Sequence, residues 1–125
     1  MTVTVVVGTR PEIIKMAPLY FALRRARLRP RLVHSGQHYD YRMSQVFFEE
    51  LGLPEPDSFL AVGSGTPGQQ TGDAIIKFEG EFSSHRPDCV LVEGDTNTVL
   101  AGAVSSVTLG IPVGHVEAGR RRDAL

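Results

Sequence analysis

Residues 3–12 read VTVVVGTRPE, an apolar run rich in β-branched residues that leads into a glycine, two polar residues and a proline. Nearly unbroken apolar character suits a strand that is buried on both faces of a parallel sheet, and Gly8 allows a sharp turn where the strand ends. Pro11 fits the first turn of a helix, where its missing N–H would have no partner. The stretch therefore predicts a strand, a tight turn and a helix start.

Two cations, Arg10 and Lys15, follow this turn closely. The free N–H groups of the first helical turn, the positive end of the helix dipole and both side chains would converge on one small volume, which attracts phosphate. The alternative is a plain strand-to-helix turn with a solvated arginine and lysine, since the sequence matches neither the dinucleotide-binding fingerprint nor the Walker loop.

Further apolar runs alternate with helical patterns along the rest of the chain. Strands are expected at 3–7, 31–35, 58–62, 89–93 and 111–116, and helices at 11–27, 40–51, 69–84 and in a segment that ends at Gly110. This alternation predicts an α/β fold with a doubly wound, parallel five-stranded sheet of order 3-2-1-4-5, Rossmann-like in architecture. Residues 1–125 are expected to form a single domain.

The helix patterns also predict which residues cap the helices and which face inward. Asp40 is the expected N-cap of the second helix and Gly52 its stop, while Thr66 and Pro67 are expected to begin the third. The second helix should bury Met43, Val46, Phe47 and Leu51, and the third Ile75, Phe78 and Phe82. The fourth helix, with its small and apolar residues Val99, Leu100, Ala103, Val104 and Val107, is expected to be buried.

The predicted strand order reverses its winding between the first and fourth strands, and ligands bind outside the carboxyl ends of strands at such a point. The residues expected at those ends are Arg10, Lys15, Asp95, His115 and Glu117. Two cations beside two carboxylates could hold a diphosphate while a carboxylate with a raised pKa moves a proton. Each also has a structural interpretation: Asp95 as a helix cap, Glu117 as a solvated loop carboxylate, His115 as a core residue, and nearby Glu93 as the partner of an arginine.

The composition is that of an ordinary soluble globular protein, with 42% hydrophobic and 22% charged residues and a net charge of -1. No basic surplus indicates a nucleic-acid partner, and no apolar run approaches the roughly 20 residues of a membrane span. We expect a cytoplasmic protein with no cofactor. Cys89 is expected to be a buried, inert thiol, and the four histidines lack metal-ligand spacing, so no metal site is expected.

Together, four motifs in this order resemble the N-terminal part of the non-hydrolysing UDP-N-acetylglucosamine 2-epimerases. They are Gly8-Thr9-Arg10-Pro11-Glu12 with Lys15, Gly36-Gln37-His38, Gly94-Asp95-Thr96-Asn97-Thr98, and 112–119 (PVGHVEAG). The resemblance implies two Rossmann-like domains of glycosyltransferase-B type with the nucleotide sugar between them. It places Arg10, Lys15 and His115 at the substrate site and Asp95 and Glu117 among the catalytic acid–base residues.

The implied reaction interconverts UDP-N-acetylglucosamine and UDP-N-acetylmannosamine, through anti elimination of UDP to a 2-acetamidoglucal and re-addition on the other face. The resemblance also implies that a second UDP-N-acetylglucosamine binds as an activator near Arg42 and Gln45, and a homodimer is a further expectation.

The sequence departs from the family pattern at Arg120, where the family usually has leucine. A later acidic motif and the second nucleotide-binding domain lie beyond Leu125 in the family pattern, so the chain is expected to be a truncated copy with little activity alone. The alternatives are a non-catalytic fragment or interaction module, and a related glycosyltransferase or hydrolysing epimerase.

Overall fold

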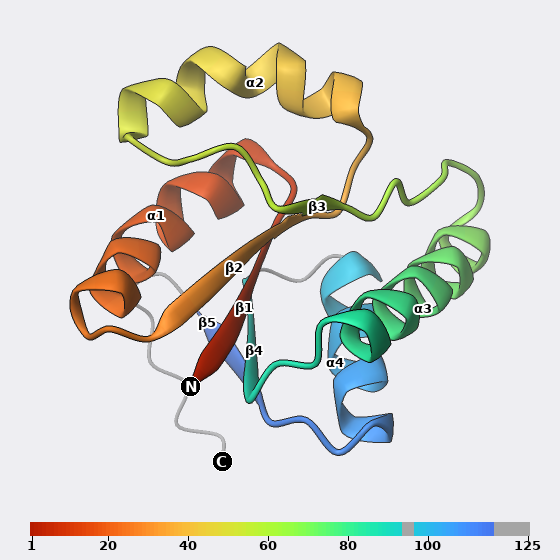
Figure 1. The fold of residues 1–125 in the computed structure, drawn as a ribbon. Helices are drawn as coiled ribbons and strands as arrows, with labels where there is room; N and C mark the ends of the chain where they lie inside the picture. The colour runs from red at the N-terminus through yellow and green to blue at the C-terminus, as the bar shows by residue number, and fades with distance from the viewer. Residues whose placement is uncertain (94–96, 117–125) are drawn as a thin grey trace, which may run out of the picture.

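The computed structural model of the chain describes residues 1–93 and 97–116. The elements in order are β1 (Thr2–Val7), α1 (Arg10–Arg25), β2 (Arg29–His34), α2 (His38–Leu51), β3 (Ser58–Phe59), α3 (Pro67–Ser84), β4 (Cys89–Glu93), α4 (Asn97–Thr108) and β5 (Val113–Val116). They form one parallel sheet in the order β3-β2-β1-β4-β5 (Figure 1). The predicted fold class and strand order are confirmed.

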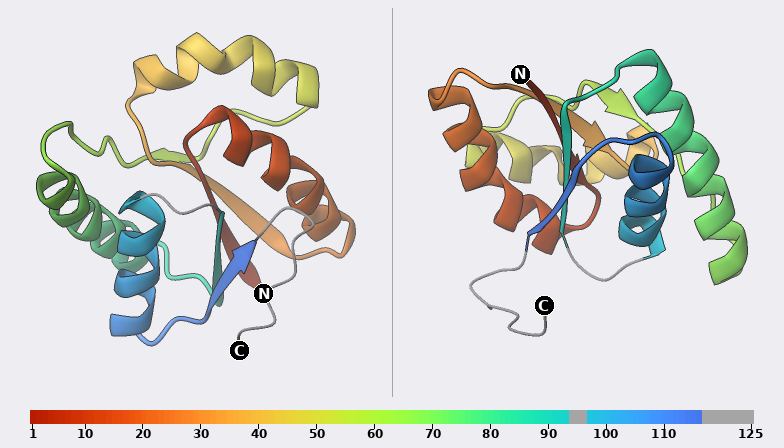
Figure 2. Two further views of the ribbon diagram at one scale, coloured as in Figure 1. Left: turned by 180° about the vertical axis from the view of Figure 1, so that it is seen from behind. Right: turned by 90° about the horizontal axis from the view of Figure 1, so that it is seen from below.

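The sheet is covered on both faces, by α1 and α2 on one side and by α3 and α4 on the other (Figure 2). Successive side chains of a strand point to opposite faces, so Val5 and Val7 of β1 pack toward α1 and α2 while Val6 packs toward α3 and α4. The buried residues form two groups. The α1/α2 cluster consists of Val3, Val5, Val7, Ile13, Met16, Ala17, Tyr20, Leu32, Tyr41, Phe48 and Leu53. The α3/α4 cluster consists of Val6, Val33, Leu60, Ala74, Phe78, Phe82, Val90, Val92, Ala101 and Ile111.

The start of α3 and the end of α2 follow the local signals in the sequence. Thr66 is the N-cap of α3 and its hydroxyl accepts a hydrogen bond from the Gln69 N–H at 3.1 Å, with Pro67 in the first helical position. Gly52 ends α2 in the left-handed backbone conformation, with φ at 77°. Both predictions are confirmed.

The predicted start and inner face of α2 are wrong in part. Gln37, not Asp40, is the N-cap, and the Asp40 carboxylate accepts the Gln37 N–H at 2.7 Å from within the first turn. Met43 and Val46 are 81% and 67% exposed, and the side of α2 that faces the α1/α2 cluster carries Tyr41 and Phe48 instead. An aspartate three residues inside a helix can cap it as well as one at its boundary, because it reaches back to the N-cap N–H.

The prediction that α4 is buried is also wrong for one face. Leu100, Val104 and Val107 are 57%, 42% and 72% exposed. The buried face instead carries small residues, Ala101, Gly102, Ser105 and Ser106. A Cβ at Gly102 would lie 3.4 Å from the Phe78 ring, so small residues allow α4 to pack closely against α3. α4 packs against α3 and against β4 and β5 of the sheet, and its outer face stays exposed.

The expectation that Cys89 is buried is wrong in part. Cys89 is only half-buried in β4, and its Sγ lies 3.8 Å from the Val90 carbonyl oxygen. Among the residues that the structure describes, no helix combines the length and the apolar character needed to cross a membrane.

Candidate functional site

The carboxyl ends of β1, β4 and β5 meet at one edge of the sheet, because the three strands are parallel and adjacent (Figure 1). We call this the carboxyl edge. The winding reverses between β1 and β4, which is where doubly wound folds bind ligands. Asp95 follows β4 and Glu117 follows β5 in the sequence, but both lie outside the described residues. Their acid–base role therefore stays a prediction.

Arg10 is the first residue of α1 and lies next to the carboxyl end of β1. Its guanidinium carbon is 5.3 Å from the centre of the Phe47 ring of α2, within the range of a cation–π interaction. The side chain is exposed and keeps its hydrogen-bond donors at the surface. This contact gives Arg10 a defined direction while leaving it open to an anion.

Lys15 lies one and a half turns into α1 and reaches across to β4. Its Nζ donates to Glu93 Oε1 at 3.0 Å. The lysine side chain is 38% exposed and the glutamate side chain 6%, so the ammonium group sits at the boundary between the buried carboxylate and the surface. The structure thus brings Lys15 to the carboxyl edge, as predicted.

Glu93 is a site residue that sequence reasoning missed. The structural interpretation of Glu93 as the partner of an arginine is wrong, because its partner is Lys15. The signal that could have identified the pair was topological: Glu93 is the last residue of the strand next to β1, and Lys15 belongs to the helix that follows β1.

Glu12 is a second buried carboxylate at the same edge. Its Oε1 accepts the Thr9 N–H at 3.1 Å and so helps to begin α1. Burial raises the pKa of Glu12 above its ordinary value of 4.5, the hydrogen bonds with Thr9 oppose this, and the nearby charge of Glu93 raises it further. Among the described residues, this edge therefore holds two buried carboxylates, Glu12 and Glu93, and of these two it is Glu93 that forms the ion pair with Lys15.

The remaining predicted binding residues lie on β5 and α2. His115 is exposed on β5 and pairs in register with Val92 of β4, one residue before Glu93. Arg42 and Gln45 are exposed on α2, and Gln45 Nε2 donates to Glu49 Oε1 at 3.2 Å on the same helix. His115 thus comes to the carboxyl edge, while the activator role of Arg42 and Gln45 stays a prediction.

The motif Gly36-Gln37-His38 follows β2 and connects it to the loop after β3. Gly36 N–H donates to Nδ1 of the buried His34 at 2.9 Å, and Gln37 Nε2 donates to the Ala61 carbonyl oxygen at 3.1 Å. His38 Nε2 lies 3.6 Å from Glu55 Oε1. These contacts position the start of α2, which in turn supplies the Phe47 ring beneath Arg10.

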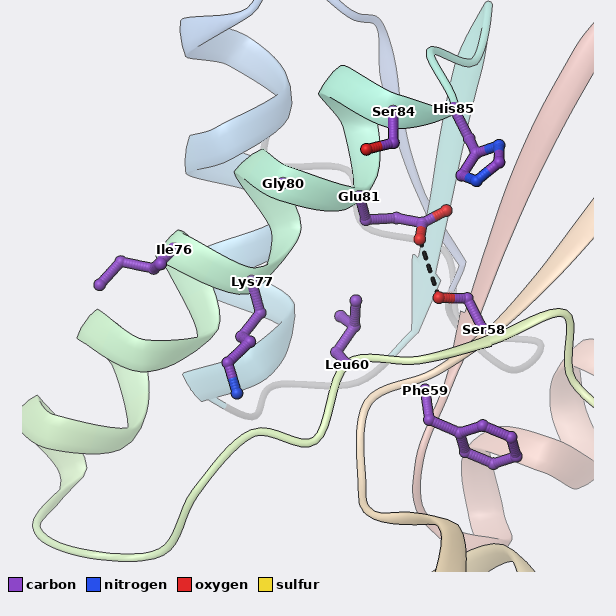
Figure 3. A pocket seen from close by; sticks show the side chains of 9 residues that line it. All are labelled: Ser58, Phe59, Leu60, Ile76, Lys77, Gly80, Glu81, Ser84 and His85. Atoms are coloured by element: carbon purple, nitrogen blue, oxygen red, sulfur yellow. Dashed lines mark hydrogen bonds between the residues drawn. The ribbon is translucent and has the colours of Figure 1, made fainter.

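A groove of about 360 Å³ opens between β3 and α3, away from the carboxyl edge (Figure 3). None of its lining residues is a predicted site residue: Ser58, Phe59, Leu60, Ile76, Lys77, Gly80, Glu81, Ser84 and His85. Its buried carboxylate, Glu81, accepts from Ser58 Oγ at 2.9 Å and from Arg31 Nε at 2.7 Å, so it is engaged in holding α3 to the sheet. Within residues 1–93 and 97–116, no group of three or more His, Cys, Asp or Glu side chains could hold a metal ion.

Comparison with known proteins identifies the family to which the chain belongs. The family model described as UDP-N-acetylglucosamine 2-epimerase matches residues 22–124. The chain belongs to the UDP-N-acetylglucosamine 2-epimerase family. A relative from Methanocaldococcus jannaschii named UDP-N-acetylglucosamine 2-epimerase is 49% identical over 121 residues, which cover 97% of this chain and 33% of the relative.

Solved structures agree with the family assignment. A crystal structure described as Methanocaldococcus jannaschii UDP-GlcNAc 2-epimerase in complex with UDP-GlcNAc and UDP is 49% identical with a TM-score of 0.86, covering 97% of this chain and 33% of that one. The chain therefore spans about a third of the length of the epimerases that it matches. A Streptomyces glycosyltransferase, SsfS6, at 20% identity and a TM-score of 0.64 shares the fold, with 94% of this chain and 38% of that chain covered.

A further relative is named for a different substrate. A relative from Pseudomonas aeruginosa named UDP-2,3-diacetamido-2,3-dideoxy-D-glucuronate 2-epimerase is 42% identical over 122 residues, covering 97% of this chain and 34% of the relative. Relatives of this chain at similar identity thus differ in the sugar that their names specify.

Proposed function

We propose that this chain forms the N-terminal third of an enzyme that inverts C2 of a UDP-linked 2-acetamido sugar, with UDP-N-acetylglucosamine as the first candidate. The observation that carries the proposal is the pair of cations at the carboxyl edge, with Arg10 next to the end of β1 and Lys15 held at the end of β4. Lys15 Nζ has donors beyond the one used by Glu93, and Arg10 has a whole exposed guanidinium, so a diphosphate could be bound between them.

In this proposal the reaction proceeds by elimination and re-addition. A base removes the C2 proton, the C1–O bond breaks with its electron pair leaving on UDP, and a 2-acetamidoglucal forms. UDP then adds back to C1 and a proton returns to the other face of C2, which gives the epimer. Asp95 and Glu117 are the proposed acid–base residues, Arg10 and Lys15 stabilise the departing diphosphate, and His115 contacts the substrate.

The test is a chimaera in which this chain replaces the N-terminal third of the Methanocaldococcus jannaschii relative. We expect it to convert UDP-N-acetylglucosamine into its C2 epimer, detected by NMR of the product. Asp95→Asn and Glu117→Gln should each lower turnover by roughly 10²–10⁴-fold, as expected for the loss of a general acid or base. Glu79→Gln, an exposed position on α3, is the matched control. Turnover near that of the unmodified chimaera in either variant would contradict the role assigned to that residue.

The Pseudomonas aeruginosa relative supports a second candidate substrate, a UDP-linked 2,3-diacetamido uronate. Both nucleotide sugars can be offered to the same chimaera, and the ratio of their kcat/KM values decides between them. The same assay distinguishes the reaction types: a 2-epimer indicates the proposed reaction, a free sugar a hydrolysing epimerase, and a transferred sugar a glycosyltransferase. A folded chimaera that forms none of these products would favour a non-catalytic module.

The proposal also includes a second copy of the chain as partner, a cytoplasmic location in which the Cys89 thiol stays reduced, and an activator site at Arg42 and Gln45.

The outer face of α4 is the proposed contact between two copies of the chain. This face exposes Leu100, Val104 and Val107, and the helix carries no charged residue. A two-fold interface brings identical faces together, so a face without charge avoids like-charge repulsion. Val104→Glu should abolish a dimer seen by sedimentation; a monomeric wild-type chain would argue against this partner.

A further inference from the structure

Two buried glutamates of this domain each hold one cation, and they lie at different places in the fold. Glu93 accepts from Lys15 Nζ at 3.0 Å at the carboxyl edge, and Glu81 accepts from Arg31 Nε at 2.7 Å between α3 and β2. The two glutamates are 5% and 8% exposed. Glu81 also accepts from Ser58, so its oxygens are occupied by the scaffold, whereas the Glu93 partner faces the candidate site.

The backbone gives Glu93 a defined position, whereas the end of the Lys15 side chain needs a partner to fix it. Glu93 ends β4, which is paired with β1 on one side and with β5 on the other, so the carboxylate has a defined position. Lys15 carries its ammonium on a flexible four-carbon stem that would otherwise sample many rotamers in water. The 3.0 Å contact fixes the end of that stem beside the strands where the winding reverses.

We propose that Glu93 is a positioning residue: it holds Lys15 Nζ at the carboxyl edge with two of its three N–H donors directed to an incoming diphosphate. This inference rests on the proposed function, since it takes Lys15 as a diphosphate ligand. An ammonium that is already fixed loses less side-chain freedom when the anion binds, so the affinity for the anion is higher.

Glu93 contributes to anion binding through its acceptor oxygen and its position, whereas its negative charge disfavours the binding of an anion. Glutamine at this position keeps an acceptor oxygen for Lys15 and removes the charge. Leucine has a similar volume and removes the acceptor, while half-exposed Lys15 can turn its ammonium into water. The two substitutions therefore separate the positioning of Lys15 from the local charge.

The experiment titrates the full chain with UDP by calorimetry. Relative to the wild type, Glu93→Leu should raise the dissociation constant about five- to tenfold, the cost of ordering one long side chain at binding. Glu93→Gln should stay within about twofold or bind more tightly. Lys15→Met should weaken binding by roughly 10–100-fold, and Glu93→Leu should add nothing further in its presence, because the two residues act through one ammonium.

Glu81→Leu is the matched control, because it breaks a buried glutamate–cation pair away from the carboxyl edge. It should lower the stability of the chain in urea and leave the UDP dissociation constant unchanged. A second readout needs no ligand: the ¹⁵N signal of the Lys15 ammonium should be protected from exchange in the wild type and in Glu93→Gln, and lost in Glu93→Leu.

The outcomes separate this inference from the proposed function. If Lys15→Met weakens UDP binding and Glu93→Leu does not, Lys15 binds the anion without positioning by Glu93 and the inference is wrong. A Lys15 ammonium signal that is unchanged in Glu93→Leu overturns it as well. If Lys15→Met binds UDP as the wild type does, the diphosphate role of Lys15 in the proposed function fails.

Discussion

Arg27, just past the end of α1, has the backbone position and conformation that Gly52 has just past the end of α2. The φ angles are 61° and 77°. In both places the next residue, Leu28 or Leu53, donates its N–H to a carbonyl five residues back, at Leu23 or Phe48. This is the Schellman motif, whose left-handed residue is usually glycine because a Cβ is strained there.

Arg27→Gly should therefore stabilise the protein by about 1 kcal/mol, since relief of the left-handed strain outweighs the extra freedom of glycine in the unfolded chain. For a domain of this size the melting temperature should rise by about 3–5 °C in calorimetry. Arg27→Ala is the control: it removes the same charge but keeps the Cβ, so its melting temperature should stay near that of the wild type. Equal gains in both variants would assign the effect to charge.

Glu12 should lower stability as pH rises through the acidic range. Burial raises its pKa in the folded state above 4.5, so between the two pKa values the unfolded chain has lost a proton that the folded chain still holds. Stability is then reduced above the folded pKa. Glu12→Gln keeps an oxygen for the Thr9 N–H and cannot ionise. Its stability relative to the wild type, from urea melts, should increase between pH 4 and pH 7; a constant difference would exclude this titration.

His34 should lower the stability of the fold as the pH falls below 6.5. Burial lowers its pKa below 6.5, opposed by the charge of Asp40. Below pH 6.5 the unfolded chain therefore binds a proton at His34 that the folded chain does not bind. The free energy of unfolding falls as the pH drops through that range. His34→Gln should lose less stability than the wild type between pH 7 and pH 5. Direct NMR titration of the His34 ring gives an independent check, because a pKa at or above 6.5 would be incompatible with the effect.

The buried face of α2 can be tested with one residue on each side of the helix. Val46 is 67% exposed, so Val46→Lys should change the free energy of unfolding by less than about 0.5 kcal/mol. Phe48 is fully buried in the α1/α2 cluster, so Phe48→Ala should cost roughly 3–5 kcal/mol. Urea melts of both variants measure the two effects. The reverse ranking would restore the inner face that the sequence pattern predicts.

The course of the chain could be predicted from the sequence because its signals are local. The β-branched run before Gly8 and the Thr66-Pro67 start each determine the conformation of their own few residues. The strand order followed from the alternation of elements and the handedness of crossovers. Each of these predictions depended on short-range chemistry or on a general rule of topology.

The errors concern what a helix packs against. A small-residue face on α4 is buried only because α3 lies close to Gly102, and nothing in the α4 sequence alone ranks this face above the one with Leu100 and Val104. The partner of Glu93 was missed for the same reason, since Lys15 lies 78 residues away in the chain. Long-range pairing requires the assembled sheet.

The sheet separates the α1/α2 cluster from the α3/α4 cluster, and this division has a consequence for altering the molecule. Losses of packing in the two clusters should add, because residues such as Tyr20 and Phe82 belong to separate clusters on opposite faces of the sheet. Either side can then be redesigned, or can drift in evolution, while the opposite side continues to support the end of β4, where Glu93 holds Lys15.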